Sequence, residues 1–227
     1  MKQWIVVCRT GREYTLAHAE AQRRQFLRHA GPAIERGWRF VCLTDQPSED
    51  WHIPLESGNR GWWSLMEMFR FNGPNILTGL DTILVGDIDP IMRFAENCPS
   101  DALFGVRNWW KRGGWASGVT LWNGDWRALY ELCGPEEMRR FRGDQDFIED
   151  AILSGLVPGR LGFLQDHPAG SGIRSFKAQI LPQGGLDPKA NIVCFHGTPR
   201  PWDVTSDHQW IRDALGEHHG DYHSLTV

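Results

Sequence analysis

Apolar residues in the first half of the chain fall into short runs separated by amphipathic, helix-like segments. A short apolar run bounded by turn residues is typical of a strand buried on both faces of a sheet. The runs predict strands at residues 4–9, 38–43, 51–55, 75–80 and 82–85, with helices at 15–30 and 61–71. Strands that alternate with helices indicate a mainly parallel sheet of nucleotide-binding character.

The second half is less regular but continues the same mixture. The pattern predicts strands at 102–107, 116–122 and 191–195, helices at 125–132, 135–141 and 144–153, and a loop-like segment at 161–183. Neither an internal repeat nor a linker divides the 227 residues. We therefore predict a single α/β domain with a mainly parallel central sheet, flanking helices and a Rossmann-like nucleotide-binding half.

Composition narrows the class of protein. The net charge of −4 argues against a general nucleic-acid surface, and no apolar run is long enough to cross a bilayer. The apolar segment after Lys2 is too short for a signal peptide and is interpreted as the first strand. The five cysteines lack paired zinc spacing, and three lie in apolar, strand-like runs, so we expect buried free thiols in a reducing cytoplasm. The 12 tryptophans are expected to lie mostly in the core, although such an excess also suits stacking on sugars or bases.

Asp81 comes at the end of the predicted strand at 75–80, where apolar packing stops. In open α/β sheets, ligands bind outside the carboxyl ends of the strands. Asp81 has two interpretations, either the cap of a turn or a ligand for a divalent cation that carries a phosphorylated substrate. Asp87 and Asp89 are assigned mainly to a turn and to the N-cap of the next helix, with Pro90 at its first position.

Other polar residues follow strands in the same way. Thr10 and Gly11 form either an ordinary β–α turn or a contact to a nucleotide. Asp45 either bonds a ribose hydroxyl or a base, or caps the next turn. Residues 144–146, Asp-Gln-Asp, open a helix, where the helix dipole alone favours acids.

Eight segments in a fixed order carry a resemblance: 4–11, 40–45, 61–64, 75–87, 117–119, 144–146, 175–177 and 196–202. Together they resemble the nucleotide-sugar glycosyltransferases of the GT-A fold, most like family 8 and its small bacterial and phage relatives. The resemblance covers most of the chain. It implies a hexosyltransferase-like enzyme that uses a nucleotide-sugar donor, expected to be a UDP-sugar, and a carbohydrate or other glycosyl acceptor. It also implies a nucleotide-binding half at about 1–90, a sugar and acceptor half at about 91–205, and a tail at 206–227.

In that family an Asp-x-Asp motif at a strand end binds Mn²⁺ or Mg²⁺, which clamps the donor diphosphate. Asp81 matches the second Asp, whereas Gly79 stands at the first, so one oxygen ligand is missing. Alternation along a strand would put both positions on one face, and water or Asp87 would fill the gap. The resemblance makes His196 the other expected metal ligand.

The resemblance also assigns the remaining site residues. Arg200 stands where a lysine usually meets the phosphate, and it is expected to contact the diphosphate; the alternative is a surface arginine that covers Trp202. The expected catalytic, sugar-facing residues are Asp144, Gln145 and Asp146. The expected donor-binding residues are Arg9, Thr10, Gly11, Asp45, Ser117, Gly118, Lys177, Gly197 and Arg200.

Two other functions stay open. The first is a nucleotide-sugar or glycan-binding protein of the same fold with weakened catalysis, for which Gly79 is the argument. The second is a nucleotidyltransferase, which usually has a glycine-rich basic loop after its first strand. Here only Arg-Thr-Gly-Arg at 9–12 stands in that position.

Overall fold

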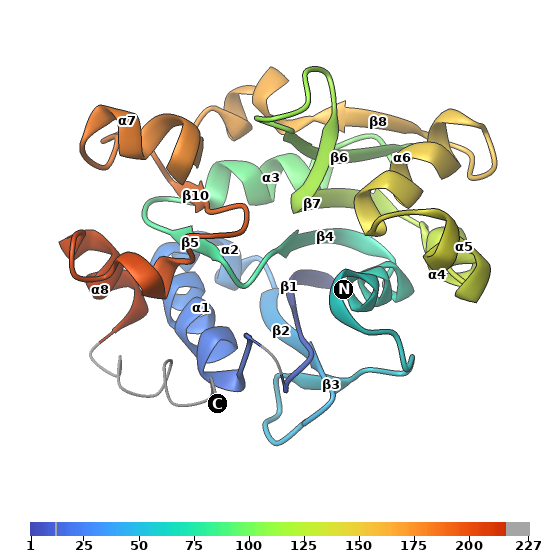
Figure 1. Cartoon of the computed structure of the whole chain (residues 1–227), viewed down its shortest axis with the longest axis horizontal. Coiled ribbons are helices and arrows are strands. Elements are labelled where there is room, and N and C mark those ends of the chain that lie inside the picture. Colours follow the sequence, from blue (N-terminus) through green and yellow to red (C-terminus); the bar gives the residue numbers. More distant parts are fainter. Residues whose placement is uncertain (12, 217–227) are drawn as a thin grey trace.

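The centre of the protein is a seven-stranded mixed sheet, seen in the computed structural model, which describes residues 1–11 and 13–216 (Figure 1). The strand order is β3-β2-β1-β4-β7-β6-β8. Strands β1 to β4 run parallel, β7 is antiparallel to both β4 and β6, and β8 is parallel to β6. The strands are β1 Lys2–Cys8, β2 Trp38–Thr44, β3 His52–Pro54, β4 Gly73–Thr78, β6 Ala102–Arg107, β7 Trp115–Gly124 and β8 Arg160–Phe163.

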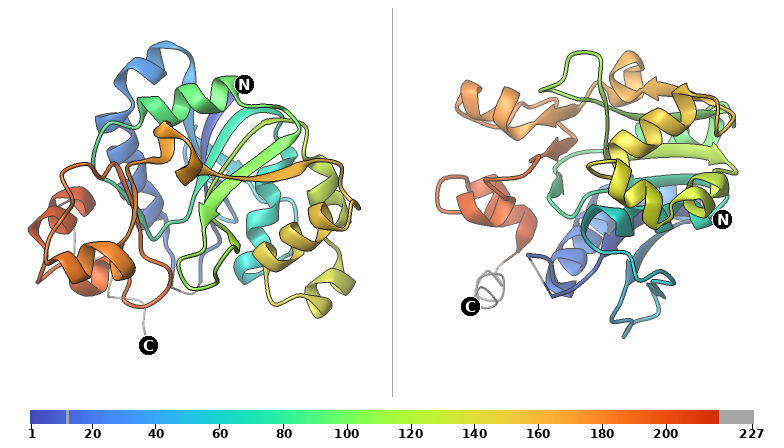
Figure 2. Two further views of the ribbon diagram at one scale, coloured as in Figure 1. Left: turned by 90° about the horizontal axis from the view of Figure 1, so that it is seen from above. Right: turned by 45° about the vertical axis from the view of Figure 1, so that its right-hand side comes forward.

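Helices cover both faces of this sheet (Figure 2). Trp4 and Val6 of β1 belong to the same apolar cluster as Phe26 of α1, whereas Ile5 belongs to the opposite cluster with Phe147 of α6. Burial on both faces explains why the strands read as continuous apolar runs. One face carries α1 Leu16–His29, α2 Gly31–Glu35 and α3 Asp89–Asn97; the other carries the 3₁₀ helix η1 Gly61–Arg70, α4 Arg127–Leu132 and α6 Asp144–Leu153. Helix α5, Pro135–Arg140, precedes α6.

A second, three-stranded sheet has the order β5-β10-β9. Its strands are β5 Thr82–Leu84, β9 Ile173–Ser175 and β10 Ile192–Cys194, with β10 antiparallel to β5 and parallel to β9. The π-helix η4 Phe176–Ile180, the short helix α7 Leu181–Gln183, the 3₁₀ turns η2 Leu164–Asp166, η3 Pro168–Gly170 and η5 Pro201–Val204, and helix α8 Gln209–Leu215 complete the chain. The pairing of β5 with β10 brings the segment after β4 close to the segment after β10.

The observed architecture confirms the predicted α/β class and most of the predicted strands. The main corrections concern the segment 161–183, predicted as a loop, which contains β9 and the end of β8. These strands have only three or four residues each and form through pairing with β10 and β6. A strand that short has too few residues to show a periodicity of its own.

Two common breaker pairs lie within regular elements. Gly31 and Pro32 follow α1 and begin α2, because proline is well tolerated in a first helical turn. Asn123 and Gly124 lie inside β7 and pair with β4. The predicted start of α3 is wrong by one residue. The N-cap of α3 is Ile88, not Asp89.

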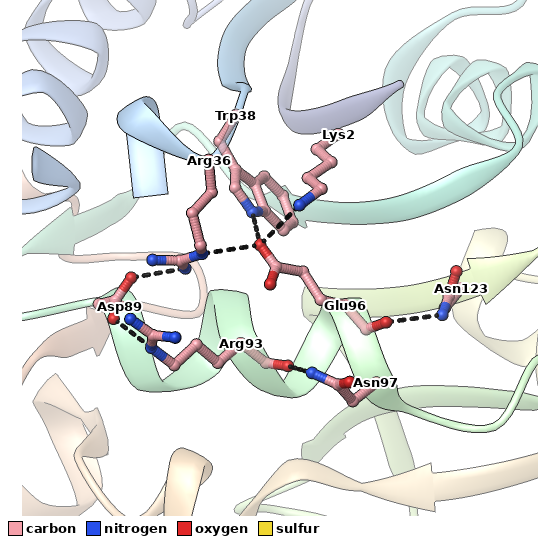
Figure 3. A network of polar contacts seen from close by, with 8 residues as sticks. All are labelled: Lys2, Arg36, Trp38, Asp89, Arg93, Glu96, Asn97 and Asn123. Atoms are coloured by element: carbon pink, nitrogen blue, oxygen red, sulfur yellow. Dashed lines mark hydrogen bonds and ion pairs between the residues drawn. The ribbon is translucent and has the colours of Figure 1, made fainter. Parts of the chain in front are cut away.

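A polar network fastens α3 to α2 and to the start of β2 (Figure 3). One oxygen of Glu96 accepts hydrogen bonds from Trp38 Nε1 at 2.7 Å and Arg36 Nε at 3.1 Å. Arg36 also reaches Asp89 at 2.6 Å, and Asp89 accepts from Arg93 Nε at 2.7 Å. The network satisfies charges that the packed helices partly remove from water.

The cysteines confirm the prediction of free thiols: four are buried, and Cys133 is partly exposed. Six of the 12 tryptophans are buried in the core, including Trp4, Trp38, Trp122 and Trp126, and four more pack against it partly buried. Within residues 1–11 and 13–216, no helix combines the length and the apolar character that a bilayer crossing requires.

Glu67 of η1 is a fully buried carboxylate that organises the loop before its own helix. Its oxygens accept the backbone N–H groups of Ser57 at 2.6 Å and Glu56 at 2.8 Å, and it pairs with Arg70 at 2.7 Å. Burial disfavours the charge, but these hydrogen bonds outweigh it and lower the pKa of Glu67. The carbonyl of Ser57 in turn accepts Nη2 of Arg9 at 2.7 Å, so Glu67 supports a predicted donor-binding residue.

Replacing Glu67 tests this loop. Glu67→Gln removes the charge and leaves one backbone N–H facing an amide donor, so the free energy of unfolding should fall by about 1–3 kcal/mol. The pKa of Glu67 is lowered on folding, so the difference from wild type should be full at neutral pH and shrink as the pH falls through that pKa. Urea denaturation at several pH values measures it, with exposed Glu131→Gln as the matched control. Equal losses in both variants would contradict the role of Glu67.

Candidate functional site

Asp81 lies on a turn that follows β4, not on the strand itself. The strand ends at Thr78; the N–H of Gly79 donates to the carbonyl of Gly118 at 3.0 Å, and the N–H of Thr82 donates to Gly79 at 3.0 Å. The predicted strand alternation of positions 79 and 81 is therefore wrong. The two positions nevertheless face the same space, because a Cβ atom at Gly79 would lie 2.8 Å from Asp81 Oδ1.

Gln22 of α1 holds this turn through hydrogen bonds. Its amide nitrogen donates to the carbonyls of Gly79 at 2.9 Å and Thr82 at 2.7 Å, and its oxygen accepts the hydroxyl of Thr78 at 3.0 Å. The same hydroxyl accepts Nε1 of Trp4 at 2.9 Å. A buried amide that satisfies two backbone carbonyls gives the turn one favoured conformation and so positions Asp81.

Arg200 crosses from the loop after β10 to meet Asp81. One terminal nitrogen of the guanidinium forms an ion pair with Asp81, while its other edge donates to both oxygens of Glu13, at 3.0 and 2.8 Å. The guanidinium carbon lies 5.4 Å from the centre of the Tyr14 ring. Burial disfavours the charged form of Arg200, but the Asp81 carboxylate and its neighbours prevail and raise its pKa. The Arg200 guanidinium is thus held by Asp81, by Glu13 and by the Tyr14 ring.

His196 lies beside this pair. It adopts a positive φ of 55° directly after the strand region, and its ring packs against Trp109 at a centroid distance of 4.5 Å. Burial lowers the pKa of His196 to about 4 against the opposing charge of Asp81, so the imidazole is neutral at pH 7. Lys177 fixes the loop, since its ammonium donates to the carbonyls of His196 at 2.6 Å and Thr198 at 3.0 Å.

The residues around Asp81 do not fit a divalent cation well. His196 Nε2 is buried and has no hydrogen-bond partner among the described residues, which suits a ligand. Asp81, however, is bound to Arg200, Gly79 offers no side-chain oxygen, and Asp87 is occupied in accepting the N–H of Asp89 at 2.9 Å. Across residues 1–11 and 13–216 no group of three or more His, Cys, Asp or Glu is placed to hold a metal. The expected Mn²⁺ or Mg²⁺ stays a prediction.

Ser117 of β7 joins the predicted sugar-facing segment. Its hydroxyl donates to Asp144 at 2.7 Å, and its N–H donates to the side-chain oxygen of Gln145 at 3.2 Å. Asp144 is buried, and burial raises its pKa to about 6 against the hydrogen bond from Ser117. Asp146, by contrast, is exposed. Asp144 is therefore placed to orient Ser117, whereas Gln145 and Asp146 are more accessible.

Strands β1 and β2 end at the same edge of the central sheet, where Thr10 is hydrogen-bonded to Asp45. The N–H and hydroxyl of Thr10 donate to the two oxygens of Asp45 at 2.9 and 3.2 Å. Asp45 thus makes a turn contact, and this contact leaves its role toward a nucleotide untested. Gly11 and Gly197 have φ values of 90° and 81°, which favour glycine at both turns.

Two tryptophans are exposed near these residues. Trp62 and Trp110 each keep 65% of their surface exposed. Trp62 packs on Gly143, just before Asp144, and the ring of Trp110 lies 5.9 Å from the ammonium of Lys177. An open hollow elsewhere, between α1 and β3, contains none of the predicted site residues in its lining. That hollow is therefore separate from the residues predicted for the site.

Sequence reasoning missed Glu13, Tyr14, Gln22 and Trp109. A signal existed for Gln22, because it stands among the apolar positions of an amphipathic helix, where an amide needs a partner. No local pattern distinguishes Glu13 or Tyr14 from ordinary loop residues.

Comparison with solved structures establishes the fold. The glycosyltransferase GlyE of Streptococcus pneumoniae TIGR4 aligns with 97% of this chain at a TM-score of 0.64 and 15% identity, and the aligned part is 61% of GlyE. The galactosyltransferase LgtC, solved with donor and acceptor sugar analogues, aligns with 98% of this chain at a TM-score of 0.54 and 12% identity, covering 94% of LgtC. A glycosyltransferase involved in glycosylating the major capsid of PBCV-1 gives a TM-score of 0.52 at 12% identity, covering 94% of this chain and 98% of that one.

The chain thus has a GT-A-like fold, a single mixed α/β domain shared with glycosyltransferase structures. It spans about three fifths of the length of the GlyE chains. No family model and no curated protein matches the sequence.

Asp144 supports a prediction about stability. A carboxyl whose pKa rises on folding favours the fold when protonated, so this contribution is full below the unfolded-state pKa and is lost as the pH rises to about 6. Asp144→Asn keeps the acceptor for Ser117 without the buried charge. It should raise the free energy of unfolding at pH 8 by about 2 kcal/mol and change it little at pH 4. Denaturation at both pH values tests this, with Asp150→Asn on the same helix as control. A variant less stable than wild type at pH 8 would contradict it.

Proposed function

We propose that this protein transfers a sugar from a nucleotide-diphosphate sugar, with a UDP-sugar as the expected donor, to a carbohydrate or other glycosyl acceptor. The observation that carries the proposal is the convergence of Asp81, Arg200, His196 and Lys177 at one edge of a glycosyltransferase-like fold. There Arg200 pairs with the Asp81 carboxylate, and Lys177 is bound to the carbonyls of His196 and Thr198 in the loop that carries Arg200. That combination suits a phosphorylated ligand.

The topology explains how a donor would lie across the site. Parallel β1, β2 and β4 have their carboxyl ends at one edge, where Thr10, Asp45 and Asp81 follow them. The strand β7 is antiparallel to β4, with Val119 paired to Thr78, so its early residues reach the same edge. We assign the nucleoside to the edge formed by β1 and β2, the diphosphate to Arg200 and Lys177, and the sugar to the Ser117 region.

The chemistry fits these side chains. Cleaving the bond between the sugar and the phosphate oxygen builds negative charge on the leaving diphosphate, and a preorganised Arg200 stabilises that charge as it forms. The sugar carbon becomes oxocarbenium-like, as in glycoside hydrolysis, and a nearby carboxylate or amide favours that state. Asp146 and Gln145 are the accessible candidates beside Ser117. The resemblance to family 8 remains part of this proposal.

One observation favours a second candidate, a nucleotide-sugar or glycan-binding protein of the same fold with weakened catalysis. Arg200 already contacts two carboxylates, Asp81 and Glu13, so its charge is partly occupied. Such a protein would bind a donor and release no product.

A panel of nucleotide sugars, each incubated with Mn²⁺ or with chelator and with candidate glycosyl acceptors, tests transfer through the release of free nucleoside diphosphate. Asp81→Asn should reduce turnover by about a hundredfold, because it loosens the anchor of Arg200 and misplaces the cation. Its melting temperature should match wild type, since the change is isosteric. Asp101→Asn, which alters an exposed ion pair with Arg160, is the control. Equal turnover by Asp81→Asn and wild type would remove Asp81 from the site, and binding without release would favour the second candidate.

Glu13 offers a test with the opposite sign. It holds two nitrogens of Arg200 that a diphosphate would need, so Glu13→Gln should tighten UDP binding. Glu13 is half exposed, and such pairs are worth about 0.2–1 kcal/mol, which corresponds to a gain of up to about fivefold. Calorimetry measures the dissociation constant, with Glu20→Gln on α1 as control. Weaker binding by Glu13→Gln would show that this carboxylate does not compete with the ligand.

A further inference from the structure

We propose that the donor site holds its nucleoside diphosphate without a divalent cation, and that the Arg200 guanidinium, fixed on Asp81, supplies the positive charge instead. The inference rests on the proposed function and specifies how that site recognises its ligand. It concerns the residues present around Asp81 and their bonding partners.

The space next to Asp81 is limited by the backbone at position 79. A Cβ atom at Gly79 would lie 2.8 Å from Asp81 Oδ1, so a carboxylate at 79 would force Asp81 to move. The backbone there is committed, since the Gly79 N–H is bound to Gly118 and its carbonyl to Gln22 and Thr82. With glycine at 79, the turn offers a single carboxylate, Asp81, which is too few oxygen ligands for a hard divalent cation.

Asp81 binds an arginine side chain. Its Oδ2 pairs with Arg200, whose side chain is only 15% exposed and is held also by Glu13 and the Tyr14 ring. A guanidinium stays charged and can grip phosphate oxygens with two parallel N–H groups. The Nε and one Nη of Arg200 are bound to half-exposed Glu13, so a diphosphate would take the place of Glu13 and bind the guanidinium directly.

The charges of the side chains around Arg200 can be compared with those of the family pattern. In the family pattern two carboxylates balance one divalent cation. Here two carboxylates, Asp81 and half-exposed Glu13, contact Arg200. Lys177 adds a second positive charge in the same loop, at the carbonyls of His196 and Thr198, so two singly charged side chains supply the charge that one divalent cation would carry.

His196 belongs to the same loop as Arg200. Its ring is packed on Trp109, and its buried Nε2 has no hydrogen-bond partner among the described residues. The imidazole Nε2 can carry an N–H, which a phosphate oxygen accepts, so a bound diphosphate would give this nitrogen a partner without any metal.

The experiment measures binding of UDP, ADP, GDP and CDP by calorimetry to the full chain in excess EDTA and in Mn²⁺. For the nucleotide that binds, the dissociation constants in the two conditions should agree within about twofold, and Mn²⁺ alone should give no saturable binding in the same instrument. Arg200→Ala should weaken binding about tenfold or more in EDTA, as expected for a lost charge-assisted contact to phosphate. Arg200→Lys should recover part of the loss, because the point charge remains. Arg160→Ala, from an exposed pair with Asp101, should leave binding unchanged.

The outcomes distinguish a failure of the cation-free site from a failure of the proposed function. Binding that needs Mn²⁺ would overturn the cation-free site and leave the proposed function standing. Binding in EDTA that survives Arg200→Ala would likewise overturn the role of Arg200. Failure of all four nucleotides to bind in either condition would overturn both proposals. The EDTA comparison on wild type needs no variant, so misfolding of Arg200→Ala would not prevent a decision.

Discussion

The side-chain amide of Gln22 is the constraint on which the site depends. Carbonyls in a buried turn must find hydrogen-bond donors, and Gln22 supplies them to Gly79 and Thr82 while accepting from Thr78. The turn after β4 is therefore tied to α1, and the direction of Asp81 follows from it. Helix α1 packs on β1 of the central sheet and on β5 of the second sheet. The Gln22 amide therefore connects both sheets to the site.

The second sheet supplies the other half of the arrangement. Pairing of β5 with β10 carries the loop after β10 to Asp81, where Arg200 closes the gap between the two segments. Lys177 then fixes that loop through two carbonyls. The position of the Arg200 cation is therefore set by the covalent chain and by packing, on a turn that carries one carboxylate, Asp81, and no side chain at Gly79.

Much of the fold follows from local sequence. The apolar runs around Trp4, Phe40 and Ile76 predict the central strands, and the spacing of Leu16 and Phe26 predicts α1. Very short strands such as β9 were missed, because three residues carry no periodicity and gain stability only from a distant partner. The placement of Asp81 near a strand end was predictable, since apolar packing stops there, but the turn that it occupies was not.

The sequence by itself determined the α/β class, the order of the elements and the gathering of polar residues at one edge, because parallel strands share their carboxyl ends. Tertiary structure alone decided that Arg200 meets Asp81 and Glu13, and that Asp144 is buried against Ser117. Each of these outcomes depends on charges and hydrogen-bond donors from different elements competing for the same oxygen atoms. That competition is settled by distance in the folded chain, which no spacing along the sequence contains.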